Sequence, residues 1–185
     1  MTVAHALLAM LLEGPADGYG LTKRFDHSVG YFWQASHQQI YRELARLEEA
    51  GWTHAKVIPQ DGRPDKRVYS ITPVGQKQLA AWLLEPAEPA PVREDLLVKV
   101  RAGALMDRPA LLKELRRRSA LHAQRLATYE AIQRHDFPDE SQLRTSAVFR
   151  YLPLLRGIMF EAENVAWCQQ AITLIEGLGD DDQER

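Results

Sequence analysis

Hydrophobic residues recur at helical spacing in the first segments of the chain. The first stripe follows a capping threonine, Thr2, and consists of Val3, Leu7 and Leu11. Residues 16–18 have the composition of a turn, and a second short helix is expected over residues 19–28. The pattern therefore predicts two short amphipathic helices joined by a turn.

A third helix is the most strongly marked segment of this half. Ser36 is a good N-cap, and Gly51 is suited to end the helix in a left-handed conformation. At about 100° per residue, Ile40, Leu44 and Leu47 fall within a narrow arc and should face the core. The opposite face is expected to carry Gln38, Gln39, Arg42 and Arg46.

Short strand-like segments replace the helical pattern after this helix. Residues 52–59 and 66–71 read as strands, and residues 60–65 between them are rich in turn formers. Thr72 and Pro73 then open a fourth helix, whose expected inner stripe is Leu79, Trp82 and Leu83. Three helices, two strands and a helix predict a winged helix-turn-helix domain with a two-stranded wing.

A proline-rich segment divides the chain. Three prolines within residues 86–91 cannot continue a helix and predict a stiff connector. Only helical patterns follow it, so the fold class is mainly α, with a C-terminal all-α domain. The predicted divisions are a winged domain at residues 1–85, a linker at 86–92, a helical domain at 93–178 and a disordered tail at 179–185.

Long helices are expected after the linker. Residues 93–105 form one segment, and Asp107 caps a longer helix that reaches about His135. Its inner positions are expected to be Leu111, Leu115, His122, Leu126, Tyr129 and Ile132. The last segment alternates apolar spacings of four and three, at Val148, Leu152, Leu155, Met159, Ala162 and Ala166. Pro153 and Gly157 predict a kink or a restart within it.

The exposed face of the third helix suits a DNA major groove. Glutamine reads adenine edges, and arginine reads guanine or grips phosphate. The N-terminal end of the helix, where backbone amides are exposed, is expected to enter the groove. The same residue types are ordinary on a solvated helix face, so this helix alone leaves the two interpretations about equal.

The hairpin adds a second basic element. Lys56, Arg63, Lys66 and Arg67 are expected on one small projection that can reach a minor groove or phosphates. Basic residues also protect exposed sheet edges, so the hairpin alone decides nothing. A basic wing directly after a recognition-type helix is much harder to explain as coincidence, and the combination predicts DNA binding.

Several motifs resemble the PadR family of transcriptional regulators. They are Gly18-Tyr19-Gly20, Ile40-Tyr41-Arg42 with Leu44, Leu47-Glu48 with Gly51, and the stretch GRPDKRVYSITPVGQKQL at residues 62–79. The resemblance is close over residues 1–85. Residues 94–97 resemble the start of a longer C-terminal helical domain found in one branch of the family.

The resemblance implies a homodimer that binds a palindromic operator, usually as a repressor. Tyr41, its neighbours and the wing at residues 62–67 would contact DNA, although His37 and Gln38 depart from the smaller residues often found there and leave the operator sequence open. The predicted DNA-contact residues are Ser36, His37, Gln38, Gln39, Tyr41, Arg42, Arg46, Lys56, Arg63, Lys66 and Arg67.

Dimerisation also has a physical reason. One recognition helix reads few base pairs, and two related by a two-fold axis multiply affinity and specificity. The long C-terminal helices carry more apolar surface than one small winged domain can cover. The predicted dimer interface is Leu111, Leu115, Leu126, Leu152, Leu155, Met159, Ala162 and Ala166.

The composition mainly excludes other classes of protein. A net charge of −2 argues only weakly against DNA, because a basic face can lie on an acidic protein. One cysteine, Cys168, allows no intramolecular disulfide or cysteine-based zinc site. Without a signal-peptide pattern or an apolar run of roughly 18 residues, a cytoplasmic protein is expected. No enzyme, cofactor or metal is predicted; the main alternative is a winged-helix protein-interaction module.

A small-molecule effector is a further hypothesis. Trp33, Trp82 and Trp167 could wall an apolar pocket for a small aromatic ligand. Members of the resembled family respond to phenolic acids, drugs or other small aromatics. The more common role of such tryptophans is to fill the core and the junction between domains.

Overall fold

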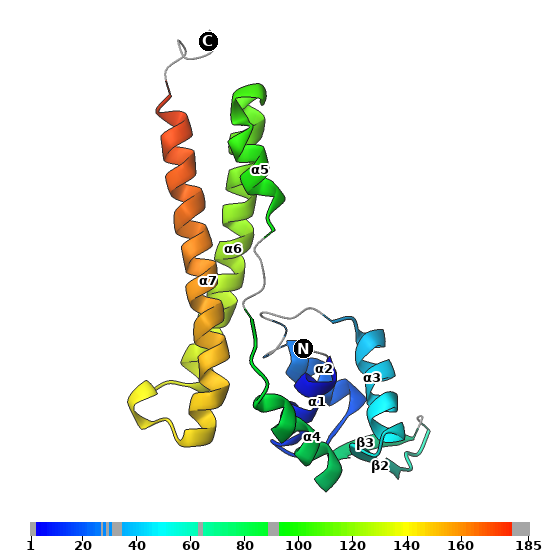
Figure 1. The fold of residues 1–185 in the computed structure, drawn as a ribbon. Helices are drawn as coiled ribbons and strands as arrows, with labels where there is room; N and C mark the ends of the chain where they lie inside the picture. Colours follow the sequence, from blue (N-terminus) through cyan, green and yellow to red (C-terminus); the bar gives the residue numbers. More distant parts are fainter. Residues whose placement is uncertain are drawn as a thin grey trace. The chain divides into compact units, whose positions relative to one another are not determined.

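The computed structural model divides into two compact units, Met1–Glu88 and Pro89–Arg185, which are described separately below (Figure 1). The boundary between them lies within the predicted linker. The structure describes residues 3–26, 28, 30, 35–62, 65–88 and 93–178. The predicted cap Thr2, the predicted pocket residue Trp33, the predicted wing contact Arg63 and the predicted tail at residues 179–185 lie outside these residues.

The first unit has the predicted order of elements. They are α1 (Val3–Leu11), β1 (Ala16–Asp17), α2 (Gly18–Asp26), α3 (His37–Glu49), β2 (Thr53–Ile58), β3 (Lys66–Ile71) and α4 (Pro73–Leu83). Within the described residues, α1 packs against α2, α3 and α4 and so forms the centre of the unit. This arrangement confirms the winged helix-turn-helix fold.

The sheet has one more strand than predicted. Its order is β1-β3-β2, and both pairings are antiparallel. The prediction of a simple turn at residues 16–18 was wrong, because Ala16 pairs with Tyr69 and Asp17 pairs with Val68. β1 covers an edge of β3 whose backbone groups would otherwise be unpaired, at the base of the wing.

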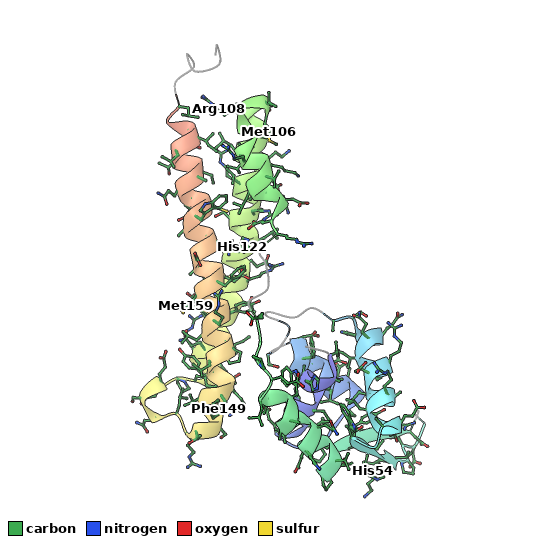
Figure 2. All side chains as sticks on the ribbon, viewed as in Figure 1. His54, Met106, Arg108, His122, Phe149 and Met159 are labelled. Atoms are coloured by element: carbon green, nitrogen blue, oxygen red, sulfur yellow. The ribbon has the colours of Figure 1, made fainter. Side chains whose placement is uncertain are left out.

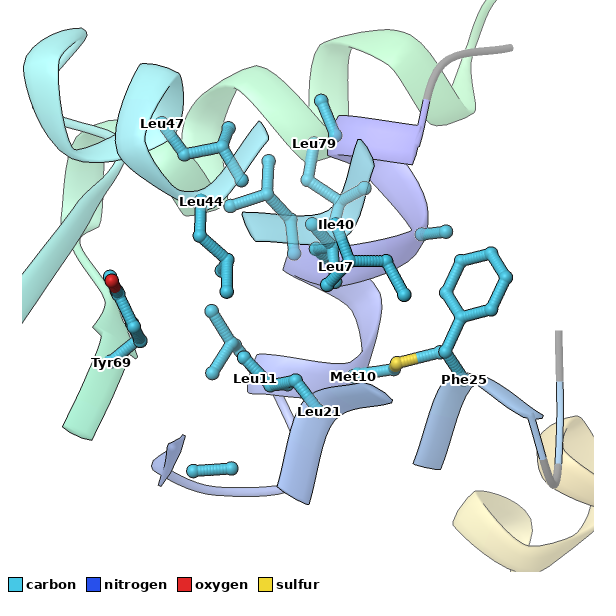
Figure 3. Close-up of a cluster of buried hydrophobic side chains, with 14 residues drawn as sticks. Leu7, Met10, Leu11, Leu21, Phe25, Ile40, Leu44, Leu47, Tyr69 and Leu79 are labelled. Carbon is cyan, nitrogen blue, oxygen red and sulfur yellow. The ribbon is translucent and has the colours of Figure 1, made fainter. Parts of the chain in front are cut away.

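The core of the first unit is built from the predicted helical stripes (Figure 3). Leu7 of α1, Leu21 and Phe25 of α2, and Ile40 and Leu44 of α3 are all fully buried. Their burial fixes how α2 and α3 turn their remaining faces to solvent.

The predicted inner stripe of α4 was right for two residues and wrong for one. Leu79 is buried and Trp82 packs against the core, but Leu83 is 67% exposed. The Trp82 indole stacks on the His5 ring, with ring centroids 4.4 Å apart, and thereby occupies the position that closes α4 against α1. Leu83, the last residue of the helix, is left outside.

Local capping sets the limits of α3 and α4 as predicted. Gly51 follows α3 with a φ of 72°, the left-handed conformation that favours glycine. The Thr72 hydroxyl accepts a hydrogen bond from the Gly75 N–H and caps α4. A side chain at position 75 would lie 2.1 Å from the Trp52 carbonyl oxygen, so only glycine lets α4 begin this close to the end of α3.

The second unit is a pair of long helices with shorter segments packed on it. Its elements are α5 (Asp95–Arg101), the 3₁₀ helix η2 (Gly103–Leu105), α6 (Arg108–Asp136), the 3₁₀ helix η3 (Glu140–Gln142) and α7 (Thr145–Glu176). Asp107 caps α6 as predicted, by accepting a hydrogen bond from the Ala110 N–H. α6 and α7 lie side by side (Figure 1).

Of the two outcomes predicted at Pro153 and Gly157, a kink or a restart, the restart does not occur. α7 runs from Thr145 to Glu176 without interruption, with Pro153 inside it. A proline inside a helix removes one backbone donor and crowds the carbonyl of the preceding turn, so neighbouring contacts must offset its cost. Tyr151 and Leu154, on either side of it, are both buried, so side-chain packing stabilises the helix around the proline.

A buried polar pair lies between α6 and α7. Glu161 is 2% exposed, and its carboxylate lies 2.5 Å from Nδ1 of His122, which confirms His122 as an inner position (Figure 2). A buried carboxylate is costly unless it is hydrogen-bonded, so this pair favours one register between the two helices.

Candidate nucleic-acid interface

The exposed face of α3 carries polar and basic side chains. Ile40, Leu44 and Leu47 are buried, so the residues between them point outward. His37, Gln38, Gln39, Arg42 and Arg46 are all exposed, and Tyr41 is 48% exposed. A surface of this composition can meet base edges and phosphates.

Capping employs two of the predicted contact residues. The Ser36 hydroxyl accepts a hydrogen bond from the Gln39 N–H, and the Gln39 carboxamide oxygen accepts one from the Ser36 N–H at 2.8 Å. This reciprocal capping box stabilises the end of α3 that the prediction places in the groove. His37 Nε2 also lies 3.7 Å from a carboxylate oxygen of Asp26 on α2.

Tyr41 is positioned by a glycine on the neighbouring helix. A Cβ atom at Gly18 would lie 2.3 Å from Cε1 of Tyr41, so the tyrosine ring rests directly on the start of α2. The Gly-Tyr-Gly motif therefore has a packing role that its sequence pattern did not reveal. The contact fixes the spacing between the two helices of the helix-turn-helix.

The wing distributes its cations over both faces. In an antiparallel ribbon, residues on alternate positions point to opposite sides. Lys56 lies opposite Val68, so Lys56 and Lys66 share one face of the hairpin, while Arg67 lies on the other. Lys56, Lys66 and Arg67 thus lie on one hairpin, but they do not all share one of its faces.

Several predicted contact cations have acidic partners. Lys66 lies 2.7 Å from Asp17, Arg67 lies 2.5 Å from Glu48, and Arg46 lies 3.2 Å from Glu43, each distance between nitrogen and oxygen. Among the predicted contact cations that the structure describes, Arg42 and Lys56 have no acidic partner. These two side chains can reach a phosphate or a base without first breaking an ion pair.

Two exposed residues of α2 were missed by the sequence reasoning. Tyr19 is 62% exposed, and Nζ of Lys23 lies 5.1 Å from the centre of its ring. In helix-turn-helix proteins the helix before the recognition helix crosses the DNA backbone, where such side chains can contact phosphate. The four-residue spacing of an aromatic and a lysine on a polar helix face was the available signal.

The tryptophans predicted as pocket walls belong to separate packing clusters. Trp82 stacks on His5 in the first unit, and burial lowers the pKa of the His5 imidazole. Trp167 packs in the second unit against a cluster formed by Leu96, Leu111 and Leu115. Trp82 and Trp167 thus each pack within the unit to which they belong.

The predicted dimer residues separate into an inner and an outer group. Leu111 and Leu115 are buried within the chain, 5% and 0% exposed, which corrects their expected role in contacting a partner. They are covered because α5 packs Leu96 onto them. Leu126 and Leu155 are half-buried, whereas Leu152, Met159, Ala162 and Ala166 are exposed.

The exposed residues of α7 form a second apolar face. Leu154, Glu161 and Cys168 recur every seven residues on the buried side. Leu152, Met159 and Ala166 recur at the same interval two positions earlier, which places them on the opposite side of the helix. Met159 is labelled in Figure 2. Part of the predicted heptad therefore lies on the side of α7 opposite to its buried residues, while Leu155 is half-buried.

Comparisons with known proteins agree with this geometry. The model of the transcriptional regulator PadR-like family matches residues 7–81, and that of the virulence activator alpha C-terminal domain matches residues 92–176. The probable transcriptional regulator Rv1176c of Mycobacterium tuberculosis is 38% identical over 95% of this chain and 98% of its own length. The chain belongs to the PadR-like family of transcriptional regulators. That family comprises regulators rather than enzymes, which confirms the prediction that this PadR-like protein is not an enzyme.

Solved structures support the same fold over nearly the whole chain. The virulence activator AphA of Vibrio cholerae has a TM-score of 0.79 and 26% identity, and the match covers 96% of this chain and all of that one. Bacillus subtilis PadR in complex with operator DNA has a TM-score of 0.78 at 24% identity, covering 94% and 98%. No helix within the described residues is both long and apolar enough to cross a membrane.

The Asp17 carboxylate makes stability depend on pH. Hydrogen bonds from the Lys66 ammonium and the Gly20 N–H hold its pKa below the ordinary value of 3.8. A carboxyl whose pKa is lower in the folded state stabilises the fold above its unfolded pKa, and the contribution is lost as the pH falls through the folded pKa. We expect Asp17→Asn to lower the free energy of unfolding at neutral pH, with wild type and variant converging in strong acid.

Urea unfolding of both proteins across a pH series measures this difference. Asp65→Asn is the control, since Asp65 is exposed and has no ion pair among the described residues. A deficit in Asp17→Asn that stays constant down to the lowest pH at which both proteins fold would contradict the assignment.

Proposed function

We propose that this PadR-like protein is a homodimeric repressor that reads a palindromic operator with α3 and the β2–β3 wing. The observation that carries the proposal is the outward face of α3, where Arg42 has no acidic partner among the described residues. The neighbouring wing exposes Lys56, which also has no acidic partner among them. Family membership supports DNA as the partner, and the solved complex of Bacillus subtilis PadR with operator DNA supports the same use of the fold.

Base reading and phosphate binding are divided between two elements. Gln38 and Arg42 lie one turn apart on the outward face of α3, where an amide and a guanidinium can meet successive base edges. Lys56 lies on an exposed face of the wing and contributes a phosphate contact. Ser36 and Gln39 act through the capping box, which presents the helix end with its free backbone amides.

A second copy of the chain is the proposed occupant of the exposed face of α7. Leu152 is 50% and Met159 59% exposed, on a helix that already buries its other side against α6. A seven-residue apolar repeat is the pattern by which long helices pack together. Pairing through this face would bring two winged domains to one operator, which its palindromic symmetry requires.

Repression and its release by a small aromatic compound are proposed from relatives. The Bacillus subtilis protein is named a negative transcriptional regulator, is 27% identical over 93% of this chain, and has a solved structure with p-coumaric acid. The Vibrio cholerae relative is named a virulence activator, so relatives of this chain include both signs of regulation. We propose that the protein acts in the cytoplasm, because a protein that binds operators must be in the same compartment as the DNA.

Removing the unpaired cations separates base reading from phosphate binding. We expect Arg42→Ala to weaken operator binding by about 1–3 kcal/mol and to relax sequence preference. Lys56→Ala should weaken binding to all sequences alike and lower the slope of log affinity against log salt by about 1. Fluorescence anisotropy with the DNA upstream of the protein's own gene, at several salt concentrations, measures both.

Lys77→Ala on α4 is the matched control, since it removes one exposed positive charge from a helix that packs on α1. It should leave affinity and salt slope close to those of the wild type. Absence of binding to any DNA at low salt would reject the regulator and favour the protein-interaction module.

Placing a charge on the exposed face of α7 should dissociate the dimer. We expect Met159→Glu to shift the protein from dimer to monomer, because two carboxylates would be buried in an apolar interface. Sedimentation equilibrium measures the shift. Thr128→Glu, on an exposed position of α6, should leave the dimer intact. A Met159→Glu variant that dimerises as tightly as the wild type would remove α7 from the interface.

An aromatic effector should lower the affinity for the operator. We expect p-coumaric acid or a related phenolic acid to release the labelled operator DNA and to change tryptophan fluorescence. Carboxylates without an aromatic ring, such as acetate, are the controls. Unchanged anisotropy and fluorescence across a broad panel of aromatic compounds would reject effector release.

A further inference from the structure

The wing leaves the sheet at a defined point on β3. β1 pairs with β3 only at Tyr69 and Val68, so at Arg67 and Lys66 the described part of β3 pairs with β2 alone. A two-stranded ribbon is only marginally stable by itself and twists more freely than a wider sheet. The direction of the wing relative to α3 is therefore decided at Lys66 and Arg67.

An ion pair braces this point on one face of the ribbon. Asp17 uses both of its carboxylate oxygens: Oδ1 accepts a hydrogen bond from the Gly20 N–H in the first turn of α2, and Oδ2 lies 2.7 Å from Nζ of Lys66. The same carboxylate thus connects the wing to α2. These two donors also lower the pKa of Asp17, as expected for a carboxylate that accepts both contacts.

A second ion pair braces the opposite face. The Arg67 guanidinium donates to Glu48 of α3 at 2.5 Å and lies 5.9 Å from the ring centre of Tyr69, which is buried. Contacts with a carboxylate and with an aromatic ring restrict the guanidinium more than a single surface ion pair would. This pair connects the wing directly to the recognition helix.

We propose that Asp17 and Glu48 are positioning residues that hold the wing at a fixed angle to α3. The inference rests on the proposed operator binding, and it reassigns Lys66 and Arg67 from phosphate contacts to the brace. With the wing held, Lys56 is presented to the DNA backbone in a constant relation to the base-reading face of α3. Holding it before binding reduces the conformational entropy lost on the DNA.

The opposite arrangement would be competition, in which the two acids occupy cations that DNA phosphates would otherwise bind. The two arrangements predict changes of opposite sign when an acid is neutralised. Loss of a brace weakens operator binding, whereas loss of a competitor strengthens it.

The test compares Glu48→Gln with Glu49→Gln in the full-length protein by operator anisotropy. Both variants remove one negative charge from the end of α3, but Glu49 is exposed and has no ion pair among the described residues. Glu49→Gln therefore measures the general electrostatic gain. We expect Glu48→Gln to bind about two- to fivefold more weakly than Glu49→Gln.

A charge exchange provides the rescue. Glu48→Arg combined with Arg67→Glu restores the ion pair in reverse and should recover most of the lost affinity, although the wing then carries no cation at position 67. Asp17→Asn, which keeps an oxygen for the Gly20 N–H, should reproduce the Glu48→Gln defect. Affinity of Glu48→Gln equal to or above that of Glu49→Gln, or no recovery in the exchange, would overturn the brace.

Amide hydrogen exchange tests the brace without DNA. Glu48→Gln should speed the exchange of the β2 and β3 amides near Val57 and Arg67, while Glu49→Gln should not. Unchanged exchange in Glu48→Gln overturns the inference. If the wild-type protein binds no DNA, the proposed function fails, and the exchange measurement still decides whether the brace exists.

Discussion

The burial of the α3 apolar stripe against α1 and α2 is the interaction on which the rest of the first unit depends. Ile40 and Leu44 are fully buried in a core that all the helices of the unit share. Because a helix that buries one face must expose the other, this packing alone turns Arg42 and Gln38 to solvent. The capping box at Ser36 then fixes where the outward face begins. The candidate DNA surface is thus a consequence of core packing.

Charge is arranged on this surface in two functional classes. Arg42 and Lys56 have no acidic partner among the described residues, whereas Lys66 and Arg67 are held by Asp17 and Glu48 at the base of the wing. A protein with a net charge of −2 can bind DNA in this way, because acids near the site restrain some cations and leave others available. If Lys66 and Arg67 act as the proposed brace, fewer hairpin cations contact phosphate than the sequence contains.

In the second unit, too, a helix buries one face and exposes the other. α7 buries Leu154 and Cys168 on one side and exposes Leu152 and Met159 on the other, so one helix has two apolar faces. The inner face is satisfied within the chain by α6, with the Glu161–His122 pair favouring one register. The outer face is what a second copy would cover in the proposed dimer. The virulence activator of Vibrio cholerae has a similar fold over nearly the whole chain.

Local patterns in the sequence were sufficient to determine the helices, their caps, the wing and the family, because helical periodicity, capping residues and turn glycines act over a few neighbouring positions. Ser36, Gly51, Thr72 and Asp107 all act as predicted. Tertiary structure alone decided the pairing of β1 with β3, the burial of Leu111 and Leu115 within one chain, and the capture of Lys66 and Arg67 by acids far away in sequence. Those outcomes depend on which segments contact each other in the folded protein. A local sequence pattern does not determine which distant residue a side chain will contact.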